Sequence, residues 1–238
     1  MRVTVVGDVL LDVDVDGRAD RLSPDAPVPV VNVDRTVRRA GGSGLVATLL
    51  AMDGVDVTLV SAFGSDAAGD ELRCLLGAVA EGEGAHGIRL VAATFNGPTP
   101  TKTRVRAADH AFVRIDEGCN DVSAAVVTNE MLEAVESADA LVVADYGRGL
   151  TADARLRDAL SRTAQRVPLV WDPHPRGTAP VPESTVVTPN LGEAVAAAGA
   201  TGSGIPAASD AASALLAEGG VAAVVVTLGC RGGVLRRG

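Results

Sequence analysis

The segment Ala140–Thr163 reads ALVVADYGRGLTADARLRDALSRT and holds one complete strand–turn–helix unit. A Val-rich run over Ala140–Ala144 is followed by a polar turn with two glycines and then by a helical pattern over Ala152–Thr163, for which Thr151 is the expected N-cap. Short strands that alternate with helices of this length predict βαβ units and a mostly parallel sheet. Such sheets bind ligands at the carboxyl ends of their strands.

The same alternation extends over most of the chain. Further strands are expected at Val3–Val6, Val57–Ser61, Leu169–Trp171, Thr185–Val187 and Ala222–Thr227. Further helices are expected near Gly44–Met52, Asp66–Val79, Ser123–Glu136 with Ser123 as N-cap, Leu191–Ala198 and Ala207–Glu218. We therefore predict one α/β domain over residues 1–238, built on a mostly parallel central sheet.

Two segments break this alternation. Arg21–Asp34 (RLSPDAPVPVVNVD) contains three prolines before a Val run, which predicts a loop that leads into an edge strand. Arg89–Asp116 contains strand-like runs with turns expected at Asn96–Gly97 and Asp109–His110. We expect these segments, about residues 12–35 and 89–116, to form a small antiparallel sheet that serves as a lid over an active site or as a dimer face.

Composition narrows the class of partner. The formal net charge is −9 and Lys102 is the sole lysine, which argues against a general surface for nucleic acid or for an anionic membrane. The three cysteines and three histidines have no metal-ligand or disulfide-framework spacing. No apolar run approaches the length of a membrane span, so a cytoplasmic protein that binds small molecules is expected.

A glycine-rich segment, Ala40–Ala51 (AGGSGLVATLLA), raises the question of a phosphate-binding loop. It follows the polar segment RTVRRA, which is expected to be a loop, and it matches neither GxGxxG nor GxxxxGK[ST]. No lysine follows to meet a phosphate. The glycines can still let backbone N–H groups approach a ligand at a helix N-terminus.

Polar residues gather where the expected strands end. Asp8 and Asp12 follow the first strand, and carboxylates there can accept hydrogen bonds from sugar hydroxyls, although a solvated turn would use the same residues. Asp145 lies in ADYGRG, and WDPHPRG follows the strand at Leu169–Trp171. Asn190 and Glu193 have the spacing of a capping box, which alone indicates the start of a helix.

The order of these motifs resembles the ribokinase (phosphofructokinase B) family of carbohydrate kinases, in particular its heptose 7-phosphate kinases. The resemblance covers the whole chain, and each motif alone is weak. The motifs are GDVLLD (7–12), RLSPDAPVPVV (21–31), AGGSGLVA (40–47), TPTKTRV (99–105), VRIDEG (113–118), ADYGRGL (144–150), WDPHPRG (171–177), TPNLGE (188–193) and VVVTLGCRGG (224–233). It implies a ribokinase-like three-layer sandwich with a small β-sheet lid.

The resemblance also implies a reaction and a set of site residues. ATP would transfer its γ-phosphoryl group to the anomeric hydroxyl of a heptose 7-phosphate, with Mg²⁺ bridging the phosphates. The residues implied for the sugar phosphate are Asp8, Asp12, Gly41, Gly42, Lys102, Arg104 and Asp145, of which Lys102 and Arg104 would meet the 7-phosphate. The residues implied for the nucleotide are Asn190, Glu193, Thr227 and Gly229, with Glu193 reaching Mg²⁺ through water. The lid would also serve as the face of a homodimer.

Two departures from the family pattern matter. Leu45 stands where relatives usually carry an asparagine that helps to hold the sugar, and leucine can neither donate nor accept a hydrogen bond. The family's catalytic aspartate lies in a GAGD motif that residues 1–238 do not contain, so the resemblance places this aspartate beyond Gly238 and assigns no catalytic residue within the chain. VLRRG at residues 234–238 is expected to lack its return strand. We therefore expect a C-terminally incomplete chain that is inactive or impaired as a kinase. The alternatives are a kinase for a different sugar and a non-catalytic protein that binds a sugar phosphate.

Overall fold

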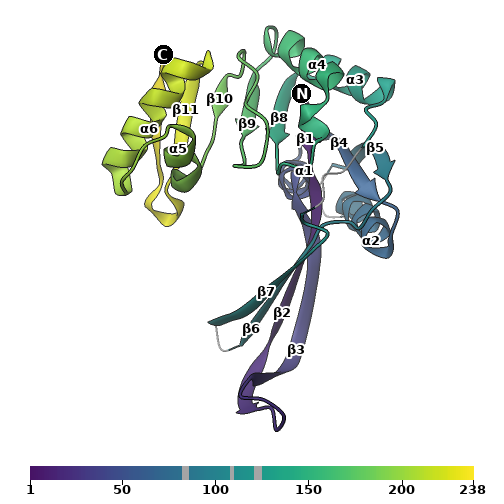
Figure 1. Cartoon of the computed structure of the whole chain (residues 1–238). Coiled ribbons are helices and arrows are strands. Elements are labelled where there is room, and N and C mark those ends of the chain that lie inside the picture. The colour runs from purple at the N-terminus through teal and green to yellow at the C-terminus, as the bar shows by residue number, and fades with distance from the viewer. Residues whose placement is uncertain (82–85, 108–109, 121–124) are drawn as a thin grey trace.

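The computed structural model describes residues 1–81, 86–107, 110–120 and 125–238. Its larger sheet has the strand order β12-β11-β10-β9-β8-β1-β4-β5 (Figure 1). All neighbouring strands are parallel except β11 and β12, which confirms the mostly parallel sheet. The strands are β1 (Arg2–Gly7), β4 (Asp56–Gly64), β5 (Ile88–Phe95), β8 (Ala140–Ala144), β9 (Leu169–Asp172), β10 (Val186–Val187), β11 (Ala223–Thr227) and β12 (Gly233–Arg237).

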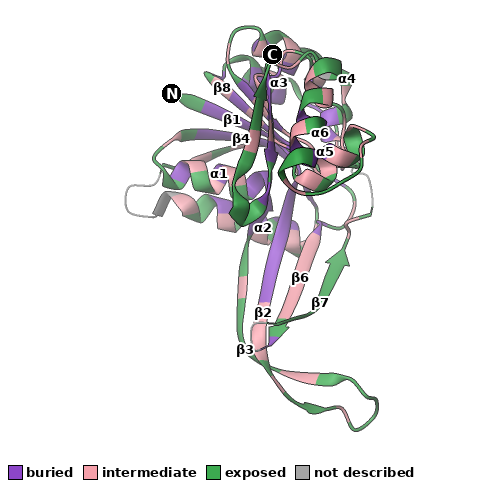
Figure 2. Ribbon diagram, turned by 90° about the vertical axis from the view of Figure 1, so that its left-hand side faces the viewer, coloured by how far each residue is buried: buried purple, intermediate pink, exposed green. Residues whose placement is uncertain are grey.

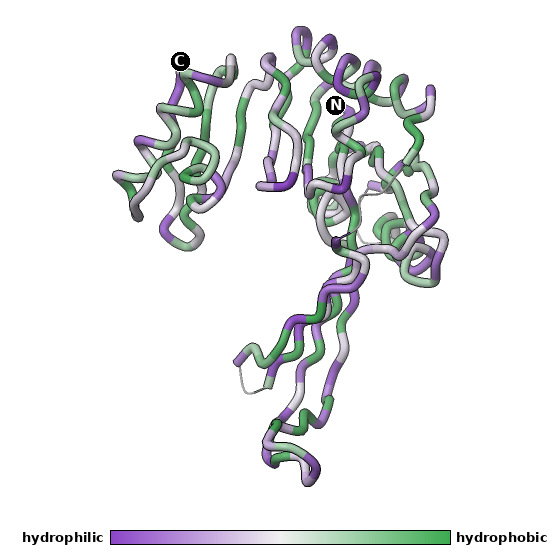
Figure 3. The backbone as a smooth tube through the Cα atoms, in the orientation of Figure 1, coloured by the Kyte–Doolittle hydropathy of each residue, from purple (hydrophilic) through white to green (hydrophobic). Residues whose placement is uncertain are grey.

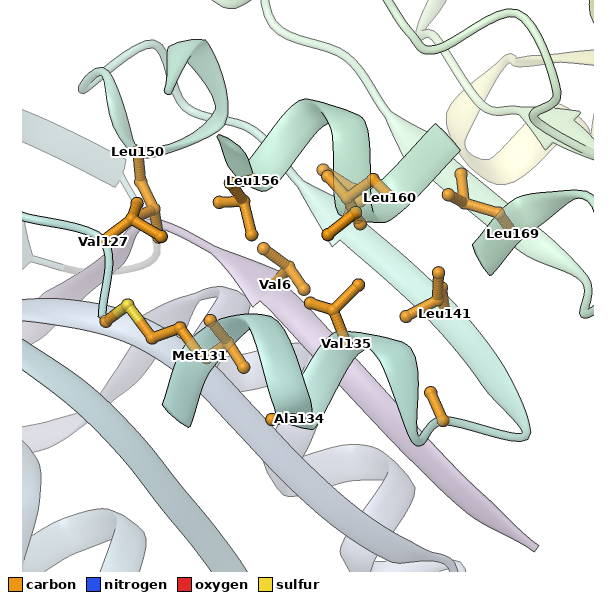
Figure 4. Packing of buried hydrophobic residues seen from close by; sticks show 14 of the residues in the cluster. Val6, Val127, Met131, Ala134, Val135, Leu141, Leu150, Leu156, Leu160 and Leu169 are labelled. Carbon is orange, nitrogen blue, oxygen red and sulfur yellow. The ribbon is translucent and has the colours of Figure 1, made fainter. Parts of the chain in front are cut away.

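Helices cover both faces of this sheet. Val5 packs in a cluster with residues of α1 and α2, whereas Val6, on the opposite face, packs with α3 and α4 (Figure 4). Val187 packs in the same cluster as α3 and α4, and its strand partner Val224 lies on the same face of the sheet. Val224 packs there against α5 and α6. The three-layer arrangement is therefore confirmed. The helices are α1 (Ser43–Met52), α2 (Ala67–Gly77), α3 (Asn129–Glu136), α4 (Ala154–Ala164), α5 (Leu191–Ala197) and α6 (Gly204–Gly219), with short 3-10 turns at Ala78–Glu81, Leu150–Ala152 and Gly229–Arg231.

A second, four-stranded sheet projects from the body and is called the lid below (Figure 1). Its strand order is β3-β2-β6-β7, and its strands are β2 (Val9–Leu22), β3 (Pro29–Gly42), β6 (Thr101–Ala107) and β7 (His110–Glu117). β2 is buried near the body and becomes exposed further out, as Figure 2 shows. The proline-containing segment of residues 23–28 connects β2 to the edge strand β3, as the sequence predicts.

Three lid predictions were wrong in detail. β2 and β6 pair in parallel, whereas β2–β3 and β6–β7 are antiparallel, so the lid is a mixed sheet and not the antiparallel sheet that the sequence predicts. Residues 89–95 belong to β5, which pairs with β4 in the large sheet, so Asn96–Gly97 connects the two sheets and does not close a hairpin. Val91, Ala93 and Phe95 are buried there, and their alternation with exposed residues fits either sheet. RTVRRA is part of the long strand β3 and not a loop. Asp109 lies outside the described residues, and β6 and β7 pair as an antiparallel hairpin around that position.

Two helix starts also differ from expectation. Asp153, not Thr151, caps α4, and its carboxylate accepts the backbone N–H of Leu156. Ser123 lies outside the described residues, and the helix that follows begins at Asn129 with Thr128 as its cap.

VLRRG has a strand partner on one side, and the return strand expected after it stays a prediction. These residues belong to β12, which is itself the return strand of an antiparallel hairpin with β11. Gly238 follows β12, and its backbone N–H donates to the Ala222 carbonyl at 3.2 Å. The hairpin therefore pairs along its whole length, because β12 supplies the hydrogen-bond partners of β11.

Hydrophobic residues are spread over both sheets and most helices of the chain (Figure 3). Within the described residues, no helix is long and apolar enough to cross a membrane.

Candidate functional site

A cavity of about 590 Å³ opens where β8, β9, β10 and β11 end. This is the edge at which parallel sheets bind ligands. Four of the predicted site residues line it, namely Asp145, Asn190, Glu193 and Thr227. The other lining residues are Val46, Val142, Tyr146, Val170, Asp172, Pro173, His174 and Thr188. We call this space the edge cavity.

Asn190 and Glu193 form the predicted capping box at the start of α5. The Asn190 side chain accepts the Glu193 backbone N–H at 3.0 Å, and the Glu193 carboxylate accepts the Asn190 backbone N–H at 2.8 Å. Asn190 also forms a β-bridge with Thr227, which fixes the end of β11 beside the helix start. Gly229 lies just beyond, with φ of 62°, in open space. One end of the edge cavity is therefore built from hydrogen-bonded backbone.

Gly238 lies away from this cavity. Because β12 runs antiparallel to β11, Arg237 pairs with Ala223 at the start of β11, whereas Thr227 at the other end of β11 lines the cavity. Gly238 follows Arg237 and therefore lies beside the start of β11, whereas the cavity lies at the other end of this strand. Gly238 does not line the cavity. The placement of the catalytic aspartate beyond Gly238 stays a prediction from the family resemblance.

Asp172 and Glu193 line the same cavity and repel each other. Burial is the main cause that raises the pKa of Asp172, and the Glu193 charge raises it further, whereas the Thr188 hydroxyl, which donates to Asp172 at 3.2 Å, lowers it. Such a pair of carboxylates fits a hydrated divalent cation, since Mg²⁺ prefers oxygen ligands and keeps several waters. The described residues contain no group of three or more His, Cys, Asp or Glu that could hold a metal ion.

Asp8 is buried and holds a turn that follows β8. One oxygen of its carboxylate accepts the backbone N–H groups of Tyr146 at 3.0 Å and Arg148 at 3.2 Å. Burial raises the pKa of Asp8 from 3.8 to about 6, against the lowering effect of these two hydrogen bonds. Asp8 does not line the edge cavity. Its role toward the substrate stays a prediction, while its carboxylate positions Tyr146, which does line the cavity.

Asp145 connects that turn to the loop after β9. One carboxylate oxygen accepts the Gly147 N–H at 2.8 Å, and the other accepts the backbone N–H and the hydroxyl of Thr178 at 2.7 and 3.0 Å. A Cβ on Gly147, which has φ of 74°, would collide with the Arg176 backbone, so the two loops lie in close contact. Asp145 therefore lines the cavity with a carboxylate that already has three protein donors.

Asp12 and Arg104 face each other across β2 and β6 of the lid. Arg104 donates to the Asp12 carboxylate at 2.5 Å, and this hydrogen bond raises the pKa of Arg104. A Cβ on Gly41 would collide with the Asp12 carboxylate, and one on Gly42, at φ of 61°, would collide with the Asp8 carbonyl. The two glycines therefore allow the close approach of β3 to β2 beside the site.

Lys102 lies on β6 and extends toward the body. Its ammonium nitrogen is 5.5 Å from the centroid of the Tyr146 ring, and the ring of His174 lies 5.9 Å from the same ring. Lys102, Tyr146 and His174 thus connect the lid, the turn after β8 and the loop after β9. Of these three, the sequence predicts only Lys102 as a site residue; Tyr146 and His174 lie within the ADYGRG and WDPHPRG motifs that end neighbouring strands.

Leu45 lies in the first turn of α1, and 37% of its surface is exposed. Its neighbour Val46 lines the edge cavity and Leu45 does not. The predicted effect of Leu45 on sugar binding stays a prediction.

Residues 1–237 match the family model described as pfkB family carbohydrate kinase. The chain belongs to this family. Among curated proteins, the chain is 48% identical to "Bifunctional protein HldE" of Streptomyces coelicolor over 99% of this chain and 48% of the relative. It is 34% identical to "Bifunctional protein HldE" of Caulobacter vibrioides over 97% of this chain and 47% of the relative. The chain therefore spans about half the length of these relatives.

Solved structures show the same fold. Arabidopsis thaliana ribokinase, solved with ribose and ATP, aligns with a TM-score of 0.71 and 20% identity over 99% of this chain and 74% of that chain. Escherichia coli phosphofructokinase-2, solved with fructose-6-phosphate, aligns with a TM-score of 0.68 and 17% identity over 99% of this chain and 76% of that chain. These likenesses confirm the ribokinase-like fold, and the HldE relatives agree with the heptose branch that the sequence resembles.

Proposed function

We propose that this pfkB-family chain is a sugar kinase of the heptose 7-phosphate 1-kinase type, which uses ATP and Mg²⁺. The observation that carries the proposal is the 48% identity to an HldE protein over 99% of the chain. The edge cavity supports it, because carboxylates lie at one side of the cavity and the lid's lysine approaches from another.

The charged side chains of the proposed site have different roles. Lys102 has no carboxylate within ion-pair distance among the described residues, and its ammonium group is available for the 7-phosphate. Arg104, in contrast, is held by Asp12. Glu193 and Asp172 would hold a hydrated Mg²⁺, which when bound neutralises charge on the transferring phosphates.

Phosphoryl transfer also needs a general base, which the family resemblance assigns to a GAGD aspartate beyond Gly238. We propose that residues 1–238 bind the substrates and that a polypeptide segment with that motif completes catalysis. Exposed apolar side chains support this proposal: on α1, Leu49 and Met52 are 54% and 63% exposed, and Leu235 of β12 is 48% exposed. A helix that is apolar on all sides is normally buried, and a parallel sheet is normally covered on both faces.

Isothermal titration calorimetry of the 238-residue chain tests the binding step. We expect heptose 7-phosphate to bind more tightly than fructose 6-phosphate or ribose, and Lys102→Met to weaken heptose 7-phosphate binding by about tenfold or more. Arg106→Met, on the same strand, is the matched control and should leave the affinity unchanged. Equal affinity for all three sugars, or no sugar binding at all, would contradict the proposal.

ADP release tests the catalytic step. We expect the chain alone to release little ADP with heptose 7-phosphate, and the addition of a polypeptide that carries the family's GAGD motif to increase the rate by about 100-fold or more. A normal rate from the chain alone would refute the need for that segment.

A kinase for another sugar is the second candidate, because Leu45 replaces the amide that the family pattern places beside the sugar. The same titrations, extended to a panel of sugars and sugar phosphates, would identify that substrate. Binding without phosphoryl transfer even in the completed protein would favour the third candidate, a non-catalytic sugar-phosphate-binding protein.

We also propose that the lid is the face of a homodimer. Its register places Val15, Val105 and Val113 in one row on one face, with Ile115 beside them, and Val113 and Ile115 are about half exposed, at 50% and 47%. An exposed apolar face of this kind marks an interaction site. Sedimentation equilibrium should show a dimer that Val113→Asp dissociates and that Arg114→Asp, on the opposite face, leaves intact. A monomer in the unmodified protein would refute the proposal.

A further inference from the structure

His174 lies in a tight turn that follows β9. The backbone N–H of Arg176 donates to the His174 Nδ1 at 3.2 Å, and the N–H of Gly177 donates to the His174 carbonyl at 2.7 Å. Prolines flank His174 on both sides and restrict the backbone. The turn is tied to the rest of the site because Thr178 donates two hydrogen bonds to Asp145. The imidazole is therefore held in one orientation by its own loop.

This geometry assigns the proton of the ring. A nitrogen that accepts a hydrogen bond carries no proton, so neutral His174 must carry its proton on Nε2. Burial, followed by the charge of Arg176, lowers the pKa of His174 below its usual value, which keeps the ring neutral near pH 7. His174, which lines the edge cavity, thus has one ring N–H that can donate to a ligand.

The surroundings of His174 show which kind of ligand the donor can meet. The ring lies 5.9 Å from the Tyr146 ring, to which the Lys102 ammonium is also close, at 5.5 Å. A neutral donor from the body and a cation from the lid therefore lie around one aromatic ring. The carboxylates of Asp172 and Glu193 line the same cavity and can take a cation, which would accompany an anionic ligand.

We propose that His174 binds substrate by donating its Nε2–H to a phosphate oxygen held in the edge cavity, with Lys102 as the second donor from the lid. This inference rests on the proposed function and adds a phosphate-binding residue to it. Both donors lie close to the Tyr146 ring, which lines the same cavity. The phosphate belongs either to the sugar phosphate or to the nucleotide, and the experiment below separates these two sources.

Calorimetric titration of the 238-residue chain at pH 7.5 with heptose 7-phosphate, and separately with ATP and Mg²⁺, tests the proposal. His174→Leu removes the donor and should weaken one of the two ligands by about tenfold or more, since hydrogen bonds to charged groups are strong. His174→Gln offers an amide N–H near the position of Nε2 and should restore the affinity to within about threefold. His86→Leu, at an exposed histidine elsewhere, is the matched control and should bind as the unmodified protein does.

The ligand whose affinity falls identifies the source of the phosphate. In the unmodified protein, ¹⁵N spectra should also show the Nε2–H tautomer of His174, and its Nε2 resonance should shift when that ligand binds. Unchanged affinity for both ligands in His174→Leu would overturn the inference and leave the proposed function intact. Equal weakening in His174→Leu and His174→Gln would also overturn it, because the loop and not the donor would then be responsible. Failure of the unmodified protein to bind either ligand would refute the proposed function itself.

Discussion

Replacing Asp8 with asparagine should stabilise the protein at neutral pH, although Asp8 is buried at the edge of the site. Both backbone donors, from Tyr146 and Arg148, reach the same carboxylate oxygen. The amide oxygen of asparagine can accept both hydrogen bonds in its place. What Asp8→Asn removes is a buried negative charge near Asp145, which itself helps to raise the pKa of Asp8.

The size of this effect on the free energy of unfolding follows from the pKa shift of Asp8. The pKa of Asp8 rises from 3.8 to about 6, so the folded state favours the protonated form. Stability from this group is complete below pH 3.8 and is lost as the pH rises through about 6. A shift of about 2 pKa units corresponds to about 3 kcal/mol at pH 7. Most of that loss occurs between about pH 4 and pH 6.

Urea unfolding of the unmodified protein and of Asp8→Asn at several pH values measures this effect. We expect the difference in unfolding free energy to be small near pH 4 and to favour the variant by up to about 3 kcal/mol at pH 7. Asp8→Ala is the control that removes the acceptor, and it should destabilise the protein because two backbone N–H groups lose their partner. A variant Asp8→Asn that is less stable than the unmodified protein at pH 7 would show that the charge itself is needed and would refute the reasoning.

Three further predictions concern Asp145, Asn190 and Leu45. Asp145→Asn should destabilise the protein by about 1–3 kcal/mol in urea unfolding. Both carboxylate oxygens of Asp145 accept hydrogen bonds, and the amide NH₂ that replaces one oxygen cannot accept from Gly147 or Thr178. Unchanged stability would contradict this prediction. Asn190→Ala should cost about 1 kcal/mol and lower Tm by about 2–4 °C in calorimetry, whereas no change would mean that the capping box contributes nothing. Leu45→Asn should tighten sugar binding by about two- to tenfold in calorimetric titration if its side chain reaches the sugar, and unchanged affinity would count against that placement.

Most of the fold could be predicted because its signals are local. Short Val runs between helical patterns identified the buried strands, and the prolines of residues 21–34 identified the connection in the lid. The strand β3 was missed at RTVRRA because an exposed edge strand can be polar. Residues 89–95 were assigned to the wrong sheet because the alternation of apolar and polar residues predicts a strand but not the strand with which it pairs. Thr151 and Asp153 are both good caps two residues apart, and only the hydrogen bond to Leu156 decides between them.

In the candidate site, too, features that depend on nearby residues could be predicted and contacts between distant residues could not. The capping box of Asn190 and Glu193 depends on residues three apart and was predicted correctly. The partners of Asp8 lie 138 and 140 residues away, so no local pattern could show that its carboxylate holds a turn. Tyr146 and His174 approach each other only because the loops after β8 and β9 are neighbours at one sheet edge.

Hydrogen exchange of the 238-residue chain, with and without ligands, tests most directly the claim that the edge cavity is the substrate site of a sugar kinase. We expect heptose 7-phosphate to slow exchange in β6 and in the turn after β8, and ATP with Mg²⁺ to slow exchange at the start of α5 and the end of β11. Protection of other elements by both ligands, with no change around Tyr146 and Asn190, would contradict the account.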